Sequence, residues 1–287
     1  MLYATIDLLD KKYIIRSKDR ESIFSIRKAY IPLLSSSKQS VVNRKMMKRL
    51  HQNHIQTVVL DNQLSADVSL QEQLIANRMY IITGERLFKV LIPLILKNIC
   101  ELIQFPIEKI KVLVLMNEYR IENVNLIKIL AQEVKQLSIV SQHYQKYQHF
   151  VLRWFEEYGY MVKLYLPQEY HNCQESFVIN LDFTENEIDK IPMLPYAIYL
   201  SFHHKMASKT SLWHGIHISD VDLEGPGLSE EKYCKMAICE AKIYQVFKSF
   251  SENLDQFSKQ NYAITGYIGE NGRIPIEEFE KIGKKFT

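Results

Sequence analysis

Histidine and carboxylate side chains, the usual protein ligands of zinc and iron, gather between residues 203 and 224. The group consists of His203, His204, His214, His217, Asp220, Asp222 and Glu224. If residues 216–223 form one strand, alternate side chains face opposite sides of it, so His217 points away from Asp220 and Asp222. The group therefore does not converge by itself. We predict a polar sheet edge or loop here and no metal site, with metal-dependent chemistry as the alternative.

Polar residues also follow four apolar runs that have the composition of buried strands, namely KVLVLM, LSIV, SFVINL and AIYLSF. Ligands of open parallel sheets bind beyond the carboxyl ends of the strands, so these positions are candidates for a ligand pocket. The alternative is that each is an ordinary polar loop residue. The candidate ligand-binding residues are Asn117, Arg120, Ser141, Asp182, His203 and His204.

The stretch 111–141, KVLVLMNEYRIENVNLIKILAQEVKQLSIVS, has the strand-turn-helix-strand rhythm of a dinucleotide-binding unit. In such a unit, glycines let the backbone approach a pyrophosphate at the N-terminus of the helix. The turn at 116–122 contains no glycine, Glu118 and Glu122 would repel phosphate, and Arg120 could compensate only in part. The acidic residue for the ribose is also missing, since Ser-Gln-His follows the second strand. The cofactor is therefore unknown, and NAD(P) is possible but disfavoured.

The elements that must position these residues alternate regularly from residue 111 onward. Near-continuous apolar strands separated by amphipathic helices predict an α/β fold with a doubly wound, mostly parallel, Rossmann-like sheet. A sixth strand is expected within 215–225, and Gly159 is expected to end the second helix. The other expected strands are 111–116, 137–140, 161–166, 176–183 and 197–202, and the expected helices are 121–134 and 145–158.

The N-terminal part of the chain predicts a smaller α/β domain. The first thirty residues contain short strand-like pieces, 38–54 has apolar residues at helical spacing, and 57–61 is typical of a buried strand. A helical pattern then runs from 70 to 103 with a break at 82–86, where Thr83 could cap a second helix. This helix is expected to connect the N-terminal domain to the next one.

Towards the C-terminus, Ser229 is expected to open a long helix that continues to about Ser251. Asn271 and Gly272 predict a turn, and Pro275 suits the first position of a last short helix. The resulting domain prediction is 1–105 for the N-terminal α/β domain with its connecting helix, 106–228 for the Rossmann-like domain, and 229–287 for a C-terminal helical segment.

The composition is that of an ordinary globular protein: 287 residues, of which 47% are hydrophobic and 24% charged, with a net charge of +3. The N-terminus lacks a basic segment followed by a long apolar run, so a secretory signal is not expected. The longest apolar stretch, 87–105, is interrupted by charged residues and Pro93, which argues against a membrane span. We therefore expect a cytoplasmic protein without a membrane partner.

The first sixty residues are basic, with twelve Lys or Arg against four Asp or Glu. Much of this excess lies in the predicted helix 38–54, where basic residues alternate with apolar ones. A basic surface could bind a phosphate-bearing partner. No aromatic residues interleave as a single-strand binder would require, so a solvated helix face is favoured and a nucleic-acid partner is not expected.

From residue 111 onward, the order and spacing of elements resembles the nucleotide domain of the shikimate dehydrogenase and glutamyl-tRNA reductase group. The resemblance is carried by KVLVLMN as first strand, by LSIVSQ as second strand with a helix starting near Gln145, and by the long helix 229–251. It implies a shared fold and a C-terminal helix that packs back on the domain. The glycine-rich turn and the catalytic Lys and Asp pair of that group have no counterpart here, so no catalytic residue is carried over.

These observations lead to two hypotheses of different classes. The first is a Rossmann-like protein with a degenerate dinucleotide site, which acts without catalysis as a binding or regulatory module for an unknown small molecule or protein partner. The alternative is an NAD(P)-dependent oxidoreductase resembling shikimate dehydrogenase, with an atypical phosphate turn. Titration with NAD(H) and NADP(H) separates the two.

Overall fold

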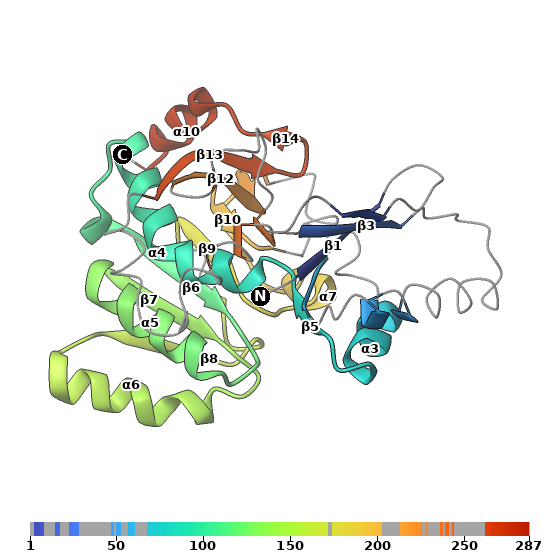
Figure 1. The fold of residues 1–287 in the computed structure, drawn as a ribbon. Coiled ribbons are helices and arrows are strands. Elements are labelled where there is room, and N and C mark those ends of the chain that lie inside the picture. The colour runs from blue at the N-terminus through green and yellow to red at the C-terminus, as the bar shows by residue number, and fades with distance from the viewer. Residues whose placement is uncertain are drawn as a thin grey trace. The chain divides into compact units, whose positions relative to one another are not determined.

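A computed structural model gives the fold (Figure 1). The residues that it describes are 3–8, 15–17, 23–28, 47–48, 50–52, 57–60, 68–171, 174–202, 213–225, 228, 236–237, 239–240, 243 and 262–286. They form two compact units, each built from two segments of the chain. The first unit comprises 1–87 and 223–262, and the second comprises 88–222 and 263–287. The three-part division expected from the sequence stays a prediction.

The first unit contains a five-stranded sheet with the strand order β2-β3-β1-β4-β5. Strand β1 runs parallel to β3 and β4, β4 runs parallel to β5, and only β2 is antiparallel to its neighbour β3. The strand-like pieces of the first thirty residues and the buried strand after them are confirmed. The strands are β1 (Tyr3–Leu8), β2 (Ile15–Ser17), β3 (Ile23–Lys28), β4 (Thr57–Leu60) and β5 (Tyr80–Ile82).

Strand β5 corrects the prediction that residues 70–82 are helical throughout. Helix α3 (Val68–Ala76) ends because Arg78 adopts a left-handed backbone conformation, with φ of 58°. The N–H of Met79 then donates to the carbonyl of Leu74 at 3.0 Å, and the chain leaves in an extended conformation. Tyrosine and isoleucine favour a strand in this position, and pairing with β4 outweighs the helical spacing.

Two predicted helices of the first unit lie only partly within the described residues. In 38–54, Met47 and Leu50 are helical and buried while Lys48 is exposed, which matches an ordinary amphipathic helix. In 229–251, the described residues between 236 and 243 are helical, and the rest of the stretch lies outside the described residues.

The second unit is built on a six-stranded sheet with the order β11-β10-β9-β6-β7-β8. Every neighbouring pair in it is parallel, as the Rossmann-like prediction requires. The strands are β6 (Lys111–Leu115), β7 (Gln136–Val140), β8 (Val162–Tyr165), β9 (Phe177–Asn180), β10 (Ile198–Leu200) and β11 (Ile216–Ile218).

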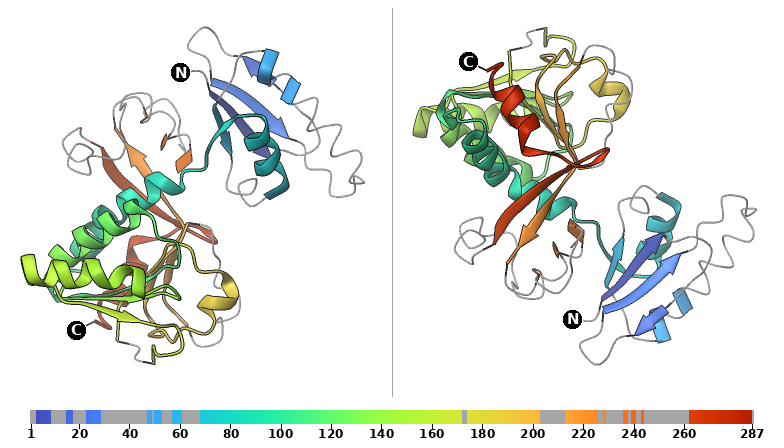
Figure 2. Two further views of the ribbon diagram at one scale, coloured as in Figure 1. Left: turned by 90° about the horizontal axis from the view of Figure 1, so that it is seen from below. Right: turned by 90° about the horizontal axis from the view of Figure 1, so that it is seen from above.

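The connections between these strands lie on opposite faces of the sheet. From β6 the chain moves through β7 to β8 at one edge, then returns to β9 and moves through β10 to β11 at the other edge. Right-handed crossovers therefore place α5 (Ile121–Glu133) and α6 (Gln145–Tyr158) on one face, where Figure 2 shows them side by side. Helix α4 (Glu85–Leu102) precedes this sheet, with Thr83 Oγ1 accepting the N–H of Glu85 at 3.3 Å.

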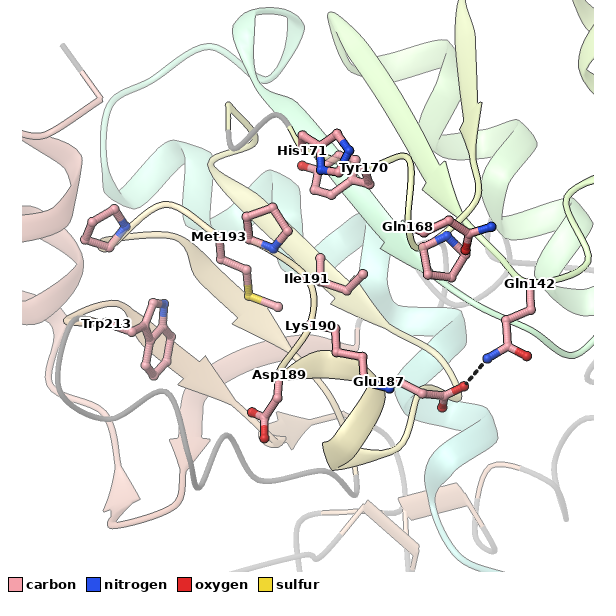
Figure 3. Close-up of a pocket in the computed structure, with 13 residues that line it drawn as sticks. Gln142, Gln168, Tyr170, His171, Glu187, Asp189, Lys190, Ile191, Met193 and Trp213 are labelled. Atoms are coloured by element: carbon pink, nitrogen blue, oxygen red, sulfur yellow. Dashed lines mark hydrogen bonds between the residues drawn. The ribbon is translucent and has the colours of Figure 1, made fainter.

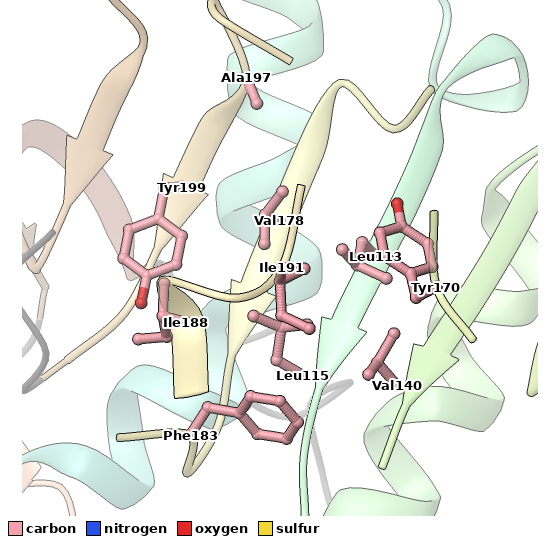
Figure 4. Packing of buried hydrophobic residues seen from close by; sticks show 10 residues of the cluster. All are labelled: Leu113, Leu115, Val140, Tyr170, Val178, Phe183, Ile188, Ile191, Ala197 and Tyr199. Atoms are coloured by element: carbon pink, nitrogen blue, oxygen red, sulfur yellow. The ribbon is translucent and has the colours of Figure 1, made fainter. Parts of the chain in front are cut away.

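The opposite face is covered by an irregular segment in place of a full helix. The connection from β9 to β10 contains only α7 (Glu185–Ile188), followed by the chain from 189 to 197. Figure 4 shows Ile188 of this segment beside Tyr199 of β10 and Ile191 over the central strands, between Val178 and Leu115, within one buried cluster. The sequence IPMLP explains the short helix, because its two prolines disfavour helical continuation.

A C-terminal element packs back on this unit, and it is the short helix α10 (Ile276–Gly283) that begins after Pro275. A Cβ on Gly283 would lie 2.8 Å from Cβ of Ile103, so the two segments touch directly. The ring of Phe286 then contacts the rings of Phe105 and Phe177. The predicted fold class is therefore confirmed, with α10 as the C-terminal helix that packs back; the helix 229–251, to which the sequence assigned this role, lies largely outside the described residues.

The sixth strand expected within 215–225 is confirmed as β11, but one strand does not run across 216–223. The chain breaks at Ser219, whose N–H donates to the carbonyl of Ile268 at 2.8 Å. Residues before the break form β11, whereas residues after it form β12 (Asp220–Glu224) in a separate sheet with the order β12-β13-β14. The predicted turn at 271–272 joins β13 (Ala263–Gly269) to β14 (Gly272–Arg273), and β13 is a strand that the sequence did not reveal.

Candidate functional site at the carboxyl ends of the parallel strands

The strand order creates a switch point beside β6, where the chain turns from one half of the sheet to the other. Strand β6 pairs with β7 on one side and with β9 on the other. In open parallel sheets, ligands bind at such a point beyond the carboxyl ends of the strands. Asn117, Ser141 and Asp182 lie within two residues of the ends of these three strands, so the structure brings them to one edge.

The side chain of Asp182 occupies the turn that a dinucleotide would use. Its Oδ1 accepts the backbone N–H of Asn117 at 2.6 Å, and its Oδ2 accepts the backbone N–H of Glu118 at 2.7 Å. Backbone donors in the turn between the first strand and the first helix are those that hold pyrophosphate in dinucleotide folds. Here, the N–H groups of Asn117 and Glu118 already donate to the carboxylate of Asp182.

Burial is the main influence on the Asp182 carboxyl group, and it raises the pKa of that group above its usual range. The two backbone hydrogen bonds and the positive charge of Lys89 oppose this shift, because they favour the ionised form. The nearby Glu118 carboxylate adds a smaller upward contribution. Asp182 is therefore a partly desolvated carboxyl group whose compensating partners are all within the protein.

Asn117 joins the ends of the neighbouring strands through its side-chain amide. Its Oδ1 accepts the backbone N–H of Gln142, just beyond β7, at 2.9 Å, and its Nδ2 donates to Oε1 of Glu187 in α7 at 3.1 Å. The amide of Gln142 also donates to that oxygen at 2.8 Å. The second oxygen of Glu187 accepts both the N–H and the hydroxyl of Thr184, at 2.9 and 2.8 Å.

Arg120 is engaged within the same turn. Its guanidinium forms an ion pair with the carboxylate of Glu118, and both side chains are about half exposed. The carbonyl of Glu118 accepts hydrogen bonds from the hydroxyl of Tyr147 at 2.9 Å and from the amide of Asn123 at 3.1 Å. The turn without glycine is thus held by side chains from α5, α6 and the loop after β9 as well as by its own Arg120–Glu118 ion pair.

Ser141 and Asn180 are buried polar residues that fix the strand ends. The hydroxyl of Ser141 accepts the N–H of His143 at 3.0 Å. Asn180 accepts the N–H of Phe183 at 2.8 Å and donates to the hydroxyl of Tyr199 at 3.0 Å, which shapes the loop that carries Asp182. Neither Asn180 nor Glu187 was singled out from the sequence. An amide in an apolar strand and the Thr-x-x-Glu capping pattern at 184–187 were the available signals.

The histidine-rich region does not form a cluster in the part of the chain that the structure describes. His203 and His204 lie outside the described residues, and His214 is exposed. His217 lies 3.3 Å from both Glu270 Oε1 and the carbonyl of Ser201. Among the described residues, no three His, Cys, Asp or Glu side chains are arranged to hold a metal ion.

A pocket of about 1100 Å³ adjoins the strand-end residues on the face that lacks a full helix. Figure 3 shows Gln142 and Glu187 at one end of it and Trp213 at the other. Its walls come from Gln142 after β7, from the residues after β8, from the connection between β9 and β10, and from Trp213, three positions ahead of β11. Among the described residues, none of the candidate ligand-binding residues lines this pocket, which sequence reasoning did not identify; the candidate residues stay a prediction.

Comparison with known proteins gives a fold likeness and no family. No protein-family model matches the chain, and no characterised protein matches it significantly in sequence.

Of the described helices, none is long and apolar enough to span a membrane.

Solved structures with a distant likeness include several Rossmann-like dehydrogenases. L-tryptophan dehydrogenase from Nostoc punctiforme is 12% identical, with a TM-score of 0.34, over 69% of this chain and 61% of that one. Shikimate 5-dehydrogenase from Listeria monocytogenes, in complex with shikimate and NAD, is 7% identical, with a TM-score of 0.32, over 76% and 85%.

Aspartate transcarbamoylase from Trypanosoma cruzi is 10% identical, with a TM-score of 0.30, over 74% and 75%. The matched region spans only half of an L-alanine dehydrogenase that is also similar. The likeness to these proteins concerns the arrangement of strands and helices alone.

Proposed function

We propose that this protein is a binding or regulatory module without catalysis, in which a Rossmann-like sheet is used without the standard dinucleotide site. The observation that carries the proposal is the pair of hydrogen bonds from the turn at Asn117 and Glu118 to the Asp182 carboxylate. A pyrophosphate at this turn would have to displace a carboxylate held by two short bonds. It would also meet the Glu118 carboxylate, so both steric and charge effects oppose it.

The strand-end residues enter this proposal in two roles. Asn117 and Asp182 hold neighbouring strand ends together through their side chains, whereas the hydroxyl of Ser141 accepts the N–H of His143 in the loop just after β7. Arg120, on the surface of the turn, stays a proposed ligand contact. The same applies to His203 and His204 after β10. The ligand itself, a small molecule or a protein partner, would bind at this edge.

The decisive experiment is a calorimetric titration of the full-length protein with NAD⁺, NADH, NADP⁺ and NADPH. We expect no saturable heat up to about millimolar concentration, where the binding free energy is only about −4 kcal/mol. A dissociation constant clearly below a millimolar for any of the four would contradict the proposal. That result would favour the alternative, an NAD(P)-dependent oxidoreductase with an atypical phosphate turn.

The Asp182→Ala variant provides an internal comparison for this titration. Removing the carboxylate frees the two backbone donors and removes one negative charge near the phosphate position. If the turn has any latent affinity for pyrophosphate, the variant should bind more tightly than the wild type. If the wild type and Asp182→Ala both bind the dinucleotide saturably and with equal heats, the dinucleotide binds somewhere other than this turn.

A further inference from the structure

The pocket beside α7 arises from a missing helix in an otherwise regular parallel sheet. A crossover between parallel strands usually contains a helix that covers the sheet, but α7 has only four residues. After it, the chain runs through Ile191, Pro192, Met193 and Pro195, all of which line the pocket. The pocket therefore occupies space beside the shortened connection, and its walls belong entirely to the second unit.

Apolar and flat side chains dominate the deeper part of this pocket. Tyr170 and Ile191 are buried members of the core beneath it, and Met193 and Trp213 pack partly buried against the same core. Flat or polarisable groups of this kind pack well against the face of an aromatic ring. The volume of about 1100 Å³ slightly exceeds the range of about 300–1,000 Å³ that is typical of pockets for small organic ligands.

The charges at the rim do not favour an anionic ligand. Glu187 already accepts four hydrogen bonds, from Asn117, Gln142 and Thr184. Of the other lining side chains, Asp189 and Lys190 are adjacent and opposite in charge. Two carboxylates against one lysine leave no cationic surplus for phosphate groups, whereas the exposed amides of Gln142 and Gln168 suit a neutral polar substituent.

Trp213 provides a second, independent observation that points to a ligand. Its indole Nε1 is buried, and it is the one buried side-chain polar atom without a hydrogen-bond partner among the described residues. A Cβ on Gly215 would lie 2.6 Å from this nitrogen and 1.9 Å from the carbonyl oxygen of Ala197, so glycine is required there to seat the ring. Buried donors are nearly always paired, and an acceptor on a bound molecule would pair with this one once the ring rotates away from Gly215.

We infer that the pocket between Gln142 and Trp213 binds an uncharged, planar aromatic molecule that carries a hydrogen-bond acceptor such as a carbonyl oxygen. The inference deepens the proposed binding function and rests on it. The aromatic plane packs among Met193, Trp213 and the prolines, and the acceptor faces the indole N–H. The amides at the opposite end contact polar substituents.

The neutral naphthalene ketone prodan has these features and is fluorescent, so it is the probe for the test. The chain contains two tryptophans, and Trp154→Phe leaves Trp213 as the sole reporter. We expect saturable binding in the micromolar range, with a blue shift of prodan emission and quenching of Trp213 fluorescence. A signal that does not saturate within the solubility of prodan would overturn the inference.

Substitutions then locate the site. Met193→Arg places a cation in the apolar part of the pocket and should weaken prodan binding at least about tenfold, which corresponds to about 1.4 kcal/mol. Met161→Arg is the matched control, because Met161 is 65% exposed and does not line the pocket; it should change the affinity less than about twofold. Unchanged affinity in a folded Met193→Arg protein would refute the site.

Two further measurements keep the test decisive. If Met193→Arg does not fold, Gln168→Phe at the exposed rim narrows the opening and should weaken binding about threefold, with unchanged affinity counting against the site. Trp213→Phe keeps an aromatic ring but lacks the N–H. It should weaken prodan more than 2-dimethylaminonaphthalene, which has no carbonyl, and equal effects on both would refute the role of the N–H.

The two proposals can fail separately. If prodan does not bind, the pocket assignment fails while the dinucleotide titration is unaffected. If NADH binds tightly, the proposed function fails, and competition between NADH and prodan then shows whether the nucleotide enters this pocket.

Discussion

Replacing Asp182 by alanine tests the central feature of the site, the internal carboxylate that holds the turn after β6. The substitution removes the acceptor of two hydrogen bonds, at 2.6 and 2.7 Å, from the backbone of Asn117 and Glu118. A hydrogen bond to a charged acceptor contributes about 1.5–3 kcal/mol to stability. The cost of burying the carboxylate, which raises its pKa, offsets part of this gain. We expect a net loss of about 2–3 kcal/mol.

Tryptophan fluorescence during urea unfolding measures this loss in the correct unit, because Trp154 and Trp213 both belong to the second unit together with Asp182. With a slope of about 2 kcal/mol per molar urea, the midpoint should fall by about 1 M. Asp189→Ala is the matched control. It removes an exposed aspartate from the same connection and should shift stability by less than about 0.5 kcal/mol.

Added phosphate tests whether the stability lost in Asp182→Ala comes from the missing anion at the two N–H groups or from the loss of the side chain in general. The freed N–H groups of Asp182→Ala should bind inorganic phosphate, so phosphate should raise the midpoint of the variant more than chloride of equal ionic strength does. The wild type should show no such difference. An Asp182→Ala midpoint within about 0.2 M of the wild type, with no phosphate effect, would refute the reasoning that this carboxylate occupies a phosphate position.

The remaining predictions concern pH and close packing. In the first unit, burial raises the pKa of Glu240 from 4.5 to about 7, although its carboxylate accepts the N–H of Leu87 at 3.1 Å. Because the pKa is higher in the folded protein, the contribution of Glu240 to the free energy of unfolding is complete below pH 4.5 and is lost as the pH rises to 7. Calorimetry at several pH values should therefore find a fall of about 3 kcal/mol in the wild type that Glu240→Gln lacks. Gly215→Ala should cost more than about 2 kcal/mol in urea unfolding, because its Cβ would lie 1.9 Å from the carbonyl of Ala197. Gly159→Ala, at φ of 72° with open space around it, should cost only about 1 kcal/mol, and equal losses would contradict the packing argument.

The sequence by itself determined the second unit's layout because its signals are local and repeated. Apolar runs of four or five residues alternate with amphipathic segments between 111 and 202, and each boundary lies close to the expected position. Helix α6 ends at Gly159 as predicted, since a left-handed residue there is favourable only for glycine. The absence of glycine from the turn after β6 was equally visible, and it pointed to a degenerate dinucleotide site.

Short strands that depend on distant partners were less predictable. Strand β5 looks helical in isolation and is extended because it pairs with β4. The segment 216–224 looks like one strand, but Ser219 bonds to Ile268 and divides it between two sheets. In both cases, hydrogen bonds to a remote strand outweigh local propensity.

The contents of the site were decided only by the tertiary structure. Asp182 lies 65 residues from the turn at Asn117 that it binds, and Gln142 and Glu187 are brought to the same place from two further loops. Trp213 faces the pocket from yet another connection. Local sequence patterns specify strands and helices because propensity and periodicity act over a few residues. They do not specify which side chain fills a turn or lines a cavity, since that depends on long-range packing of the whole sheet.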